Sequence, residues 1–326
     1  MLKIGVLGAG YLGKIHISQL KEISSIQLTG FYDPDKSLTE EVAMEYTIKP
    51  YHTEDELINS CEAVDIVANT TEHFRLAKKC IEKGKHIFIE KPVTETVEQA
   101  KELLFLAEKH HVKVQVGHVE RFNPAFQAAI PFNLKPLFIE SHRLSEFNPR
   151  GTDVSVVLDL MIHDIDVVMH IVKSPIKHIS ASGVTIVSGN PDIANARIEF
   201  ENGCVANLTA SRISLKKERK MRIFQHGAYI LIDFLNKVTE RFSLADSSGD
   251  LNTLSFVIDT GSDRKIVKMD KPAIPTTNAI KYELEAFVSA ITGNTSPIVT
   301  LQDGHDSLAI AFQIIDQIKT REARYI

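Results

Sequence analysis

The sequence has no tryptophan and only three cysteines among its 326 residues. Cys61, Cys80 and Cys204 lie far apart and form no Cys-x-x-Cys pair, which argues against a disulfide framework and against a structural zinc site. A run of roughly 20 apolar residues, the minimum for a bilayer span, is missing, and so is the apolar core of a signal peptide. These absences predict a cytoplasmic protein without a membrane partner.

Excess positive charge is missing as well. Lysine and arginine number 37 against 42 aspartate and glutamate residues, a formal net charge of −5, so the bulk electrostatics do not favour a nucleic-acid partner. The composition, with 44% hydrophobic and 24% charged residues, is the ordinary mixture of a globular protein. A chain of this length suits about two domains, each with its own core.

Residues 1–120 alternate short apolar runs, rich in β-branched residues, with segments of helical period. This alternation is typical of β-α-β units and of a parallel sheet covered by helices on both faces. The expected strands are Lys3–Leu7, Ile26–Tyr32, Asp65–Ala68, His86–Glu90 and Lys113–Val116, and the expected helices include Thr71–Lys83 and Thr94–His110. We therefore predict an α/β domain with a parallel, doubly wound sheet over residues 1–120.

The pattern changes after Gly117, where strands follow one another mostly without helices between them, which indicates a mainly antiparallel sheet. The expected strands are Leu137–Phe147, Ile179–Val187, Ala196–Glu201, Cys204–Ser211 and Met221–Gln225, and the expected helices are Val156–Lys173, Ala279–Ile291 and Leu301–Ile318. Asn202-Gly203 suits a two-residue hairpin turn with positive φ at both positions. We predict an α+β domain over residues 121–326, with the C-terminal helices bracing the two domains.

A glycine motif follows the first expected strand. Gly8-Ala9-Gly10-Tyr11-Leu12-Gly13 matches Gly-x-Gly-x-x-Gly and leads into a helical segment. In such a loop the first glycine permits a tight turn, the second lets the backbone approach a pyrophosphate, and the third lets helix and strand pack closely. The alternative is a glycine-rich turn that only closes a strand-helix corner. The position between a strand and a helix favours a dinucleotide site, with helix amides donating to the phosphates.

Asp33 ends the second expected strand, 20 residues after Gly13. A carboxylate at this position accepts hydrogen bonds from the adenosine ribose hydroxyls of NAD and repels the 2′-phosphate of NADP. Lys36 lies close enough in sequence to weaken the charge argument. We predict NAD(H) as the preferred cofactor and NADP(H) as the less favoured one.

Glu90-Lys91-Pro92 directly follows the expected strand His86–Glu90. Pro92 biases Lys91 away from α geometry, so the lysine is expected at the carboxyl edge of the sheet, where ligands of open α/β sheets bind. There its ammonium group would bind a substrate hydroxyl and stabilise a developing alkoxide. The alternative is a solvated lysine at a strand end.

Four polar residues share one face of the long apolar helix: Asp159, His163, Asp166 and His170. The interpretations left open are a helix in the core of the second domain, a helix that covers a catalytic cleft, an amphipathic helix with its charges in water, and an Asp/His metal site. His163 is the candidate general base, because imidazole titrates near pH 6.5 and thus suits removal of an alcohol proton. Asp159, one turn earlier, would orient the ring or bind a second hydroxyl, and His170 is assigned to packing.

Together these features resemble the glucose–fructose oxidoreductase/inositol dehydrogenase/MocA family, over nearly the whole chain. The resemblance rests on the Gly8–Gly13 loop, Asp33, Asn69-Thr70-Thr71-Glu72-His73, Glu90-Lys91-Pro92 and Asp159-x-x-x-His163. It implies that Lys91, Asp159 and His163 form the catalytic group, without a metal.

The resemblance also implies a Rossmann domain that binds NAD, and a second domain whose sheet is open on one face and serves substrate binding and oligomer contacts, in a homodimer or homotetramer. The residues expected at the cofactor are Gly8, Gly10, Tyr11, Leu12, Gly13, Asp33, Asn69, Thr70, His73, Glu90 and Lys91.

A narrower similarity lies in the segment from Gly117 to Pro124, Gly-His-Val-Glu-Arg-Phe-Asn-Pro. It resembles members of the family that oxidise nucleotide-linked amino sugars such as UDP-N-acetylglucosamine. His118 and Arg121 are therefore expected to contact substrate, with a hinge anchor as the alternative for Arg121. The basic run at residues 216–220 would neutralise a diphosphate or, as charge runs usually do, form a solvated surface.

We thus predict an oxidoreductase that transfers a hydride between nicotinamide and a secondary alcohol of a sugar or nucleotide-sugar, carbon 3 of UDP-N-acetylglucosamine being one candidate. Two alternatives remain, a glycosidase of the same family that uses NAD transiently and an NAD-binding sensor without catalysis. The complete set of Lys91, Asp159 and His163 argues against the sensor.

Overall fold

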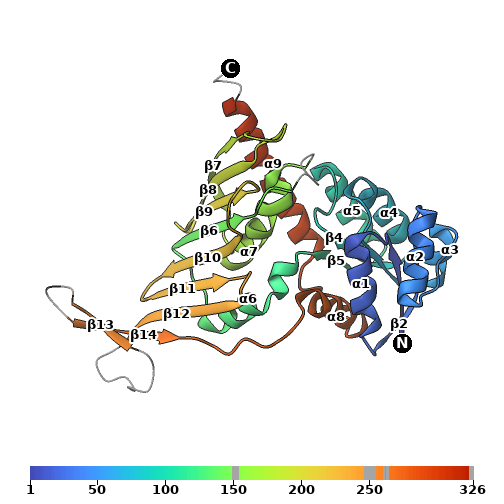
Figure 1. The fold of residues 1–326 in the computed structure, drawn as a ribbon, viewed down its shortest axis with the longest axis horizontal. Helices are drawn as coiled ribbons and strands as arrows, with labels where there is room; N and C mark the ends of the chain where they lie inside the picture. Colours follow the sequence, from blue (N-terminus) through green and yellow to red (C-terminus); the bar gives the residue numbers. More distant parts are fainter. Residues whose placement is uncertain (149–153, 246–254, 260, 262–263, 323–326) are drawn as a thin grey trace. The chain divides into compact units, whose positions relative to one another are not determined.

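The computed structural model describes residues 1–148, 154–245, 255–259, 261 and 264–322. The chain forms two compact units, each assembled from two stretches of sequence (Figure 1). The first unit contains Met1–Phe122 and Thr277–Ala309, and the second contains Asn123–Thr276 and Ile310–Ile326. The described helices include none that is long and apolar enough to cross a membrane.

The first unit contains a five-stranded parallel sheet, as predicted, with the order β2-β1-β3-β4-β5. Its strands are β1 (Leu2–Leu7), β2 (Ile26–Tyr32), β3 (Ala63–Ile66), β4 (His86–Glu90) and β5 (Val114–Gly117). The bounds predicted for β2 and β4 are confirmed, whereas β3 begins and ends two residues earlier than predicted. Its register explains the shift, because Ile66 pairs with Leu7 at the end of β1 and leaves the next residues outside the sheet.

Helices cover both faces of this sheet, which makes it doubly wound. The helices of the unit are α1 (Tyr11–Lys21), α2 (Lys36–Tyr46), α3 (Glu54–Ser60), α4 (Thr70–Glu82), α5 (Val97–Lys109) and α8 (Ala279–Thr292), with a 3₁₀ turn η1 (Val119–Phe122). Side chains alternate across a strand. Ile4 and Val6 of β1 therefore share a core with α1, α2 and α8, while Gly5 lies against Leu57 of α3 on the other face.

The second unit contains a nine-stranded sheet, with the order β13-β14-β12-β11-β10-β6-β9-β8-β7. Its strands are β6 (Phe138–Leu144), β7 (Ile176–Val184), β8 (Ile193–Phe200), β9 (Val205–Ser211), β10 (Glu218–Gln225), β11 (Ala228–Asp233), β12 (Val238–Ala245), β13 (Ser255–Asp259) and β14 (Arg264–Asp270). Only the β6-β9 pair among these is parallel. The prediction of a mainly antiparallel sheet is therefore confirmed.

One face of the nine-stranded sheet is buried against helices and the other face is open. The remaining helical segments are α6 (Pro124–Ala129), η2 (Ile130–Phe132), a π-helical turn η3 (Val157–Met161), α7 (Ile162–Val172) and α9 (Leu301–Glu322). Phe126, Val167 and Ile314 pack with the inward-facing strand residues in one core. Burial alternates along β6, which is the pattern of a sheet with one solvated face.

The turn between β8 and β9 differs from the two-residue hairpin predicted at Asn202-Gly203. Gly203 has φ +84°, but Asn202 is absent from the described residues with positive φ. The amide of Gly203 donates to the carbonyl of Phe200 at 3.0 Å. The loop therefore contains three residues, with the glycine in the left-handed region of a bulge, and this arrangement requires positive φ at one position only.

Candidate active site

The carboxyl ends of β1, β2 and β3 line a cavity of about 680 Å³. The strand order reverses between β1 and β3, and ligands of open α/β sheets bind at such a switch point. Four of the residues predicted at the cofactor line this cavity, namely Gly8, Gly10, Asp33 and Asn69. The other residues predicted at the cofactor belong to the first unit but do not line this cavity, namely Tyr11, Leu12, Gly13, Thr70, His73, Glu90 and Lys91.

The three glycines of the loop have three different environments. Gly8 has φ +98°, and a Cβ there would lie 2.7 Å from the amide nitrogen of Ala68. A Cβ on Gly13 would lie 2.3 Å from the carbonyl oxygen of Gly8, whereas a Cβ on Gly10 would meet no described atom within 4 Å. The loop therefore turns at Gly8, packs tightly at Gly13 and leaves open space at Gly10, in front of the N-terminus of α1. This geometry fits a dinucleotide pyrophosphate.

Gly13→Ala should mainly lower stability, whereas Gly10→Ala should mainly weaken NADH binding. Gly13→Ala should lower the free energy of unfolding by about 1–3 kcal/mol, because its methyl group collides with backbone. Gly10→Ala should change the free energy of unfolding by less than about 1 kcal/mol, since φ at Gly10 is −61° and the space around it is open. The same substitution should weaken NADH binding about tenfold or more, because the added methyl group blocks the pyrophosphate. Urea unfolding and NADH titration measure both. Unchanged NADH affinity in Gly10→Ala would contradict the assignment of this loop.

Asp33 joins the glycine loop to the end of β2. Its Oδ2 accepts a hydrogen bond from the amide of Ala9 at 2.7 Å, and its Oδ1 accepts one from the amide of Asp35 at 2.9 Å. A carboxylate offers about four acceptor positions, so capacity remains for two ribose hydroxyls. The side chain is only partly buried and lines the cavity, which is the placement that ribose recognition needs.

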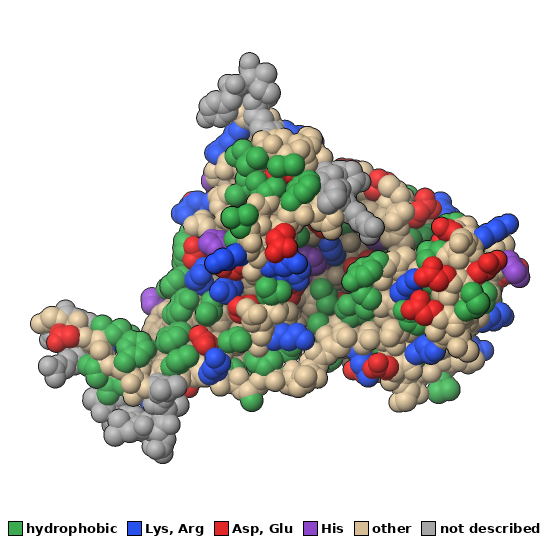
Figure 2. Space-filling view, in the orientation of Figure 1, with side chains coloured by type: hydrophobic (Ala, Val, Ile, Leu, Met, Phe, Trp, Pro, Cys, Tyr) green, Lys and Arg blue, Asp and Glu red, His purple; other side chains and the backbone are tan. Residues whose placement is uncertain are grey.

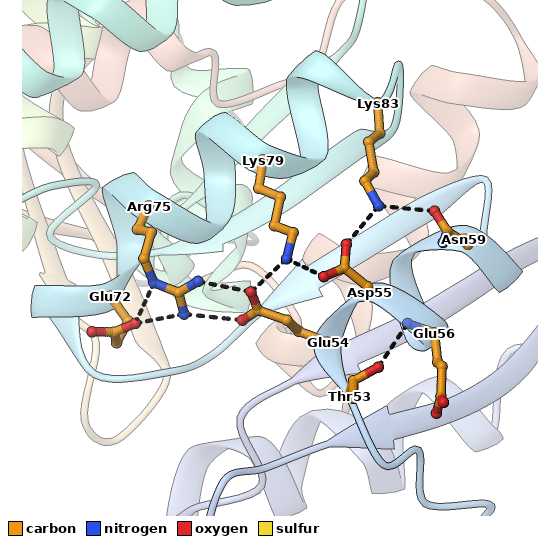
Figure 3. A network of polar contacts seen from close by, with 9 residues as sticks. All are labelled: Thr53, Glu54, Asp55, Glu56, Asn59, Glu72, Arg75, Lys79 and Lys83. Atoms are coloured by element: carbon orange, nitrogen blue, oxygen red, sulfur yellow. Dashed lines mark hydrogen bonds and ion pairs between the residues drawn. The ribbon is translucent and has the colours of Figure 1, made fainter.

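An ion-pair ladder that sequence reasoning missed (Figure 3) contributes Glu54, Glu72 and Arg75 to the lining of the cavity. The Arg75 guanidinium donates to both oxygens of Glu54, at 2.8 and 2.9 Å, and to Glu72 at 2.8 Å. The ladder continues along α3 and α4 through Lys79, Asp55 and Lys83. The sequence contained one signal for this ladder. Charged residues recur every three or four positions along the predicted helix, which places them on one face, namely Glu72, Arg75, Lys79 and Lys83.

His73 links the loop after β3 to the segment containing Lys91. Its two ring nitrogens lie 2.9 Å from the carbonyl oxygens of Ala68 and Pro92. The ring is almost fully buried and lies outside the cavity lining, so it holds two loops together. Lys91 follows β4 at the carboxyl edge of the sheet, as predicted, with a partly exposed side chain and a cis peptide bond to Pro92.

Asp159 and His163 lie in the second unit, at the start of the predicted helix. That helix begins with the π turn Val157–Met161, and α7 follows from Ile162. Single π turns inside helices are frequent at functional sites. Both side chains are partly exposed, and the Nδ1 atom of His163 is buried.

Two aspartates of this helix are not solvated, Asp166 on the polar stripe and Asp164 beside it. Asp166 is fully buried and Asp164 is 2% exposed, which excludes a helix with all its charges in water. Asp164 accepts from Arg143 Nε at 2.8 Å and from the Ser141 hydroxyl at 2.9 Å. His170 packs edge-on against Phe126 with ring centroids 6.1 Å apart, which confirms its assignment to packing.

The segment after β5 is buried in the first unit. Arg121 is 2% exposed and His118 is 1% exposed, and the Arg121 guanidinium lies 3.3 Å from Asp303, near the start of α9. This pairing favours the anchoring interpretation of Arg121. In the basic run, Lys216 and Lys217 are exposed, as a solvated surface requires.

The glycine loop, the acid after β2 and the cavity at the switch point define a Rossmann-type dinucleotide-binding protein. Residues 2–118 match the family model described as "Oxidoreductase family, NAD-binding Rossmann fold", and residues 116–230 match the GFO/IDH/MocA C-terminal domain. The chain belongs to the glucose–fructose oxidoreductase/inositol dehydrogenase/MocA family, and it is an NAD-binding oxidoreductase.

Relatives with named activities show how far the similarity reaches. The chain is 33% identical to the UDP-N-acetylglucosamine 3-dehydrogenase of Acidithiobacillus ferrooxidans over 96% of each protein. A solved structure of that enzyme matches 98% of both chains with a TM-score of 0.88. The chain is also 30% identical to the scyllo-inositol 2-dehydrogenase (NAD(+)) of Bacillus subtilis, over 65% of this chain and 68% of that protein.

Proposed function

We propose that this protein oxidises the carbon-3 hydroxyl of UDP-N-acetylglucosamine, or of a close nucleotide-sugar analogue, with NAD as the hydride acceptor. The observation that carries the proposal is the full-length similarity to a UDP-N-acetylglucosamine 3-dehydrogenase. The chemistry needs a base for the hydroxyl proton and a cation near the oxygen. His163 and Lys91 are the residues of this chain that match those roles.

In the proposed mechanism the glycine loop and Asp33 hold the dinucleotide, and NAD when bound supplies the carbon atom that accepts the hydride. His163 takes the proton from the substrate hydroxyl as the C–H bond breaks. Lys91 donates a hydrogen bond to the same oxygen and stabilises its developing negative charge, and Asp159 orients the substrate or the imidazole. Each residue thereby acts most strongly on the transition state.

The charges at the cavity support a preference for NAD over NADP. Four carboxylates, those of Asp33, Asp35, Glu54 and Glu72, line the cavity, and among the described lining residues Arg75 is the one cation. Its guanidinium already donates to Glu54 and Glu72 (Figure 3), and Lys36 does not line the cavity. A 2′-phosphate would therefore enter a negative environment, at a cost of about 3 kcal/mol, or roughly a hundredfold in affinity.

We further infer a homo-oligomer that associates through the open face of the nine-stranded sheet. Aromatic rings contact one another in a row across neighbouring strands, from Phe138 through Phe224 and Tyr229 to Phe242. An apolar groove over β11–β14 extends this surface, and Figure 2 shows hydrophobic side chains in this part of the second unit. Phe224 is exposed and the other three rings are partly exposed, and aromatic patches at the surface are typical of protein interfaces. The three cysteines are buried free thiols, which supports a cytoplasmic location.

The test is an assay of purified protein with NAD and a panel of UDP-N-acetylglucosamine, UDP-glucose and myo-inositol. We expect NADH formation with a kcat/KM at least about tenfold higher for UDP-N-acetylglucosamine than for the other two, and about 10²-fold lower rates with NADP. Mass spectrometry should find a product lighter by two hydrogen atoms.

Two results would contradict the proposal. NADH formation with inositol but with no nucleotide-sugar would indicate that the substrate is a polyol. Release of a free sugar without net NADH formation would favour the glycosidase alternative, because hydride would then return to the substrate within each turnover.

A further inference from the structure

A buried cluster of ionisable groups lies in the first unit beneath Lys91. His16 comes from α1, Asp65 from β3, Glu90 from the end of β4 and Glu283 from α8. Ligand atoms of His16, Glu90 and Glu283 all lie within 4.8 Å of one another, and all four side chains are buried. Three carboxyl groups and one imidazole in such a space cannot all be ionised without a large cost in free energy.

His16 supplies the positive charge of the cluster. Its Nδ1 lies 2.9 Å from Asp65 Oδ2, and its Nε2 lies 3.4 Å from Glu90 Oε1. Burial alone would lower the pKa of His16, but the carboxylates of Asp65 and Glu90 outweigh burial and raise that pKa well above its usual value. The raised pKa favours a doubly protonated ring, in which Nδ1–H donates to Asp65 and Nε2–H faces Glu90 without forming a hydrogen bond.

Glu90 is the anion that this cluster stabilises. Its Oε2 accepts a hydrogen bond from the backbone amide of Lys91 at 3.1 Å. Gly117 makes room for the carboxylate, because a Cβ there would lie 2.6 Å from Glu90 Oε1. Burial opposes ionisation, yet His16 and Lys91 hold the pKa of Glu90 below its ordinary value. The ionised group therefore fixes the peptide that begins the Lys91-Pro92 segment.

Glu283 has the opposite environment. It is fully buried, and neither of its carboxyl oxygens has a hydrogen-bond partner among the described residues. The groups that face it are Glu90, His16, Asp65 and, from η1, Glu120, while the Gln115 amide on β5 donates to its backbone carbonyl at 2.7 Å. Burial and the charge of Glu90 raise the pKa of Glu283 well above its ordinary value.

We propose that Glu283 is a neutral carboxylic acid in the folded protein, that its O–H donates toward the Glu90 carboxylate directly or through one water molecule, and that this interaction positions Lys91. The positioning role rests on the proposed function, whereas the neutral state of Glu283 does not. Separations of up to 4.8 Å are within reach of a single bridging water. Glu283 is thus a positioning residue that acts through Glu90.

The neutral state has a measurable signature in the pH dependence of unfolding. An unfolded glutamate loses its proton at about pH 4.3, whereas Glu283 in the folded protein keeps its proton above that pH. The protonated group therefore stabilises the fold at low pH, and this contribution is lost as pH rises toward the pKa of the folded state. Glu283→Gln cannot titrate. The unfolding constant of the wild type, divided by that of Glu283→Gln, should therefore rise up to about tenfold per pH unit above pH 5.

Glu285→Gln, on the same helix but partly exposed, is the matched control and should give a ratio that is flat with pH. A flat ratio for Glu283→Gln as well would overturn the neutral state. Infrared spectra should also contain the carbonyl stretch of a protonated carboxyl group that disappears in Glu283→Gln. An equimolar divalent metal in purified wild type that is lost in Glu283→Gln would overturn the proposal too, since the cluster would then be a cation site.

The positioning role is tested by comparing kcat of the wild type with kcat of two Glu283 variants. Glu283→Leu removes the donor and should lower kcat about tenfold with little change in NADH affinity, and should shift the pH profile of kcat. Glu283→Gln keeps an N–H donor and should restore most of the loss. Equal activity of wild type and Glu283→Leu would remove the positioning role. Absence of activity in wild type on every substrate tested would instead count against the proposed function, and the unfolding experiment would still decide the state of Glu283.

Discussion

His163→Ala is expected to lower kcat by about 10²-fold or more, because removal of a general base from an alcohol oxidation costs about 10² to 10⁴-fold. NADH affinity should stay within about threefold of wild type, since the predicted dinucleotide contacts are in the first unit. The pH dependence of kcat should also flatten on its acid side. Steady-state kinetics over pH and a fluorescence titration with NADH give these values.

His178→Ala is the matched control for this experiment, because His178 is an exposed histidine on β7 in the same unit. It should retain wild-type kinetics. Unchanged turnover in His163→Ala would exclude His163 from the mechanism. Partial recovery of His163→Ala activity by added imidazole would support its role as a base in particular.

Lys91→Met is expected to lower kcat by about 10²–10³-fold, since methionine keeps the apolar stem of the side chain but removes the charge that we propose stabilises the developing alkoxide. The effect should appear equally in kcat and kcat/KM, as for an interaction made only in the transition state. Lys101→Met, an exposed lysine on α5, is the control and should behave as wild type.

The double variant Lys91→Met/His163→Ala tests whether the two residues act on one reaction. Residues that act as a unit show strongly non-additive losses, so the double variant should be little slower than the slower single variant. Losses that multiply would indicate two independent effects and would contradict a shared role at the substrate oxygen.

The local sequence pattern was sufficient to predict much of the secondary structure of the first unit. The strands β2 and β4 end where predicted, because each is a nearly continuous apolar run bounded by polar residues, and the glycine loop has the three environments that its spacing implies. The strands β11–β14 of the nine-stranded sheet were harder to predict. The strands β11–β14 were not located from sequence, since exposed strands such as β13, exposed along its whole length, depend on their pairing partners for order.

The sequence by itself determined the class of fold, the cofactor loop and the identity of Lys91, Asp159 and His163 as candidates, because glycine spacing, strand ends and helical offsets are local properties of the chain. Only the tertiary structure decided that α8, from the C-terminal stretch, covers the first sheet and brings Glu283 to His16 and Glu90. It also decided that Arg75 is held between two glutamates at the cavity. Both arrangements join residues far apart in sequence, so burial and charge set their chemistry only after the chain has folded.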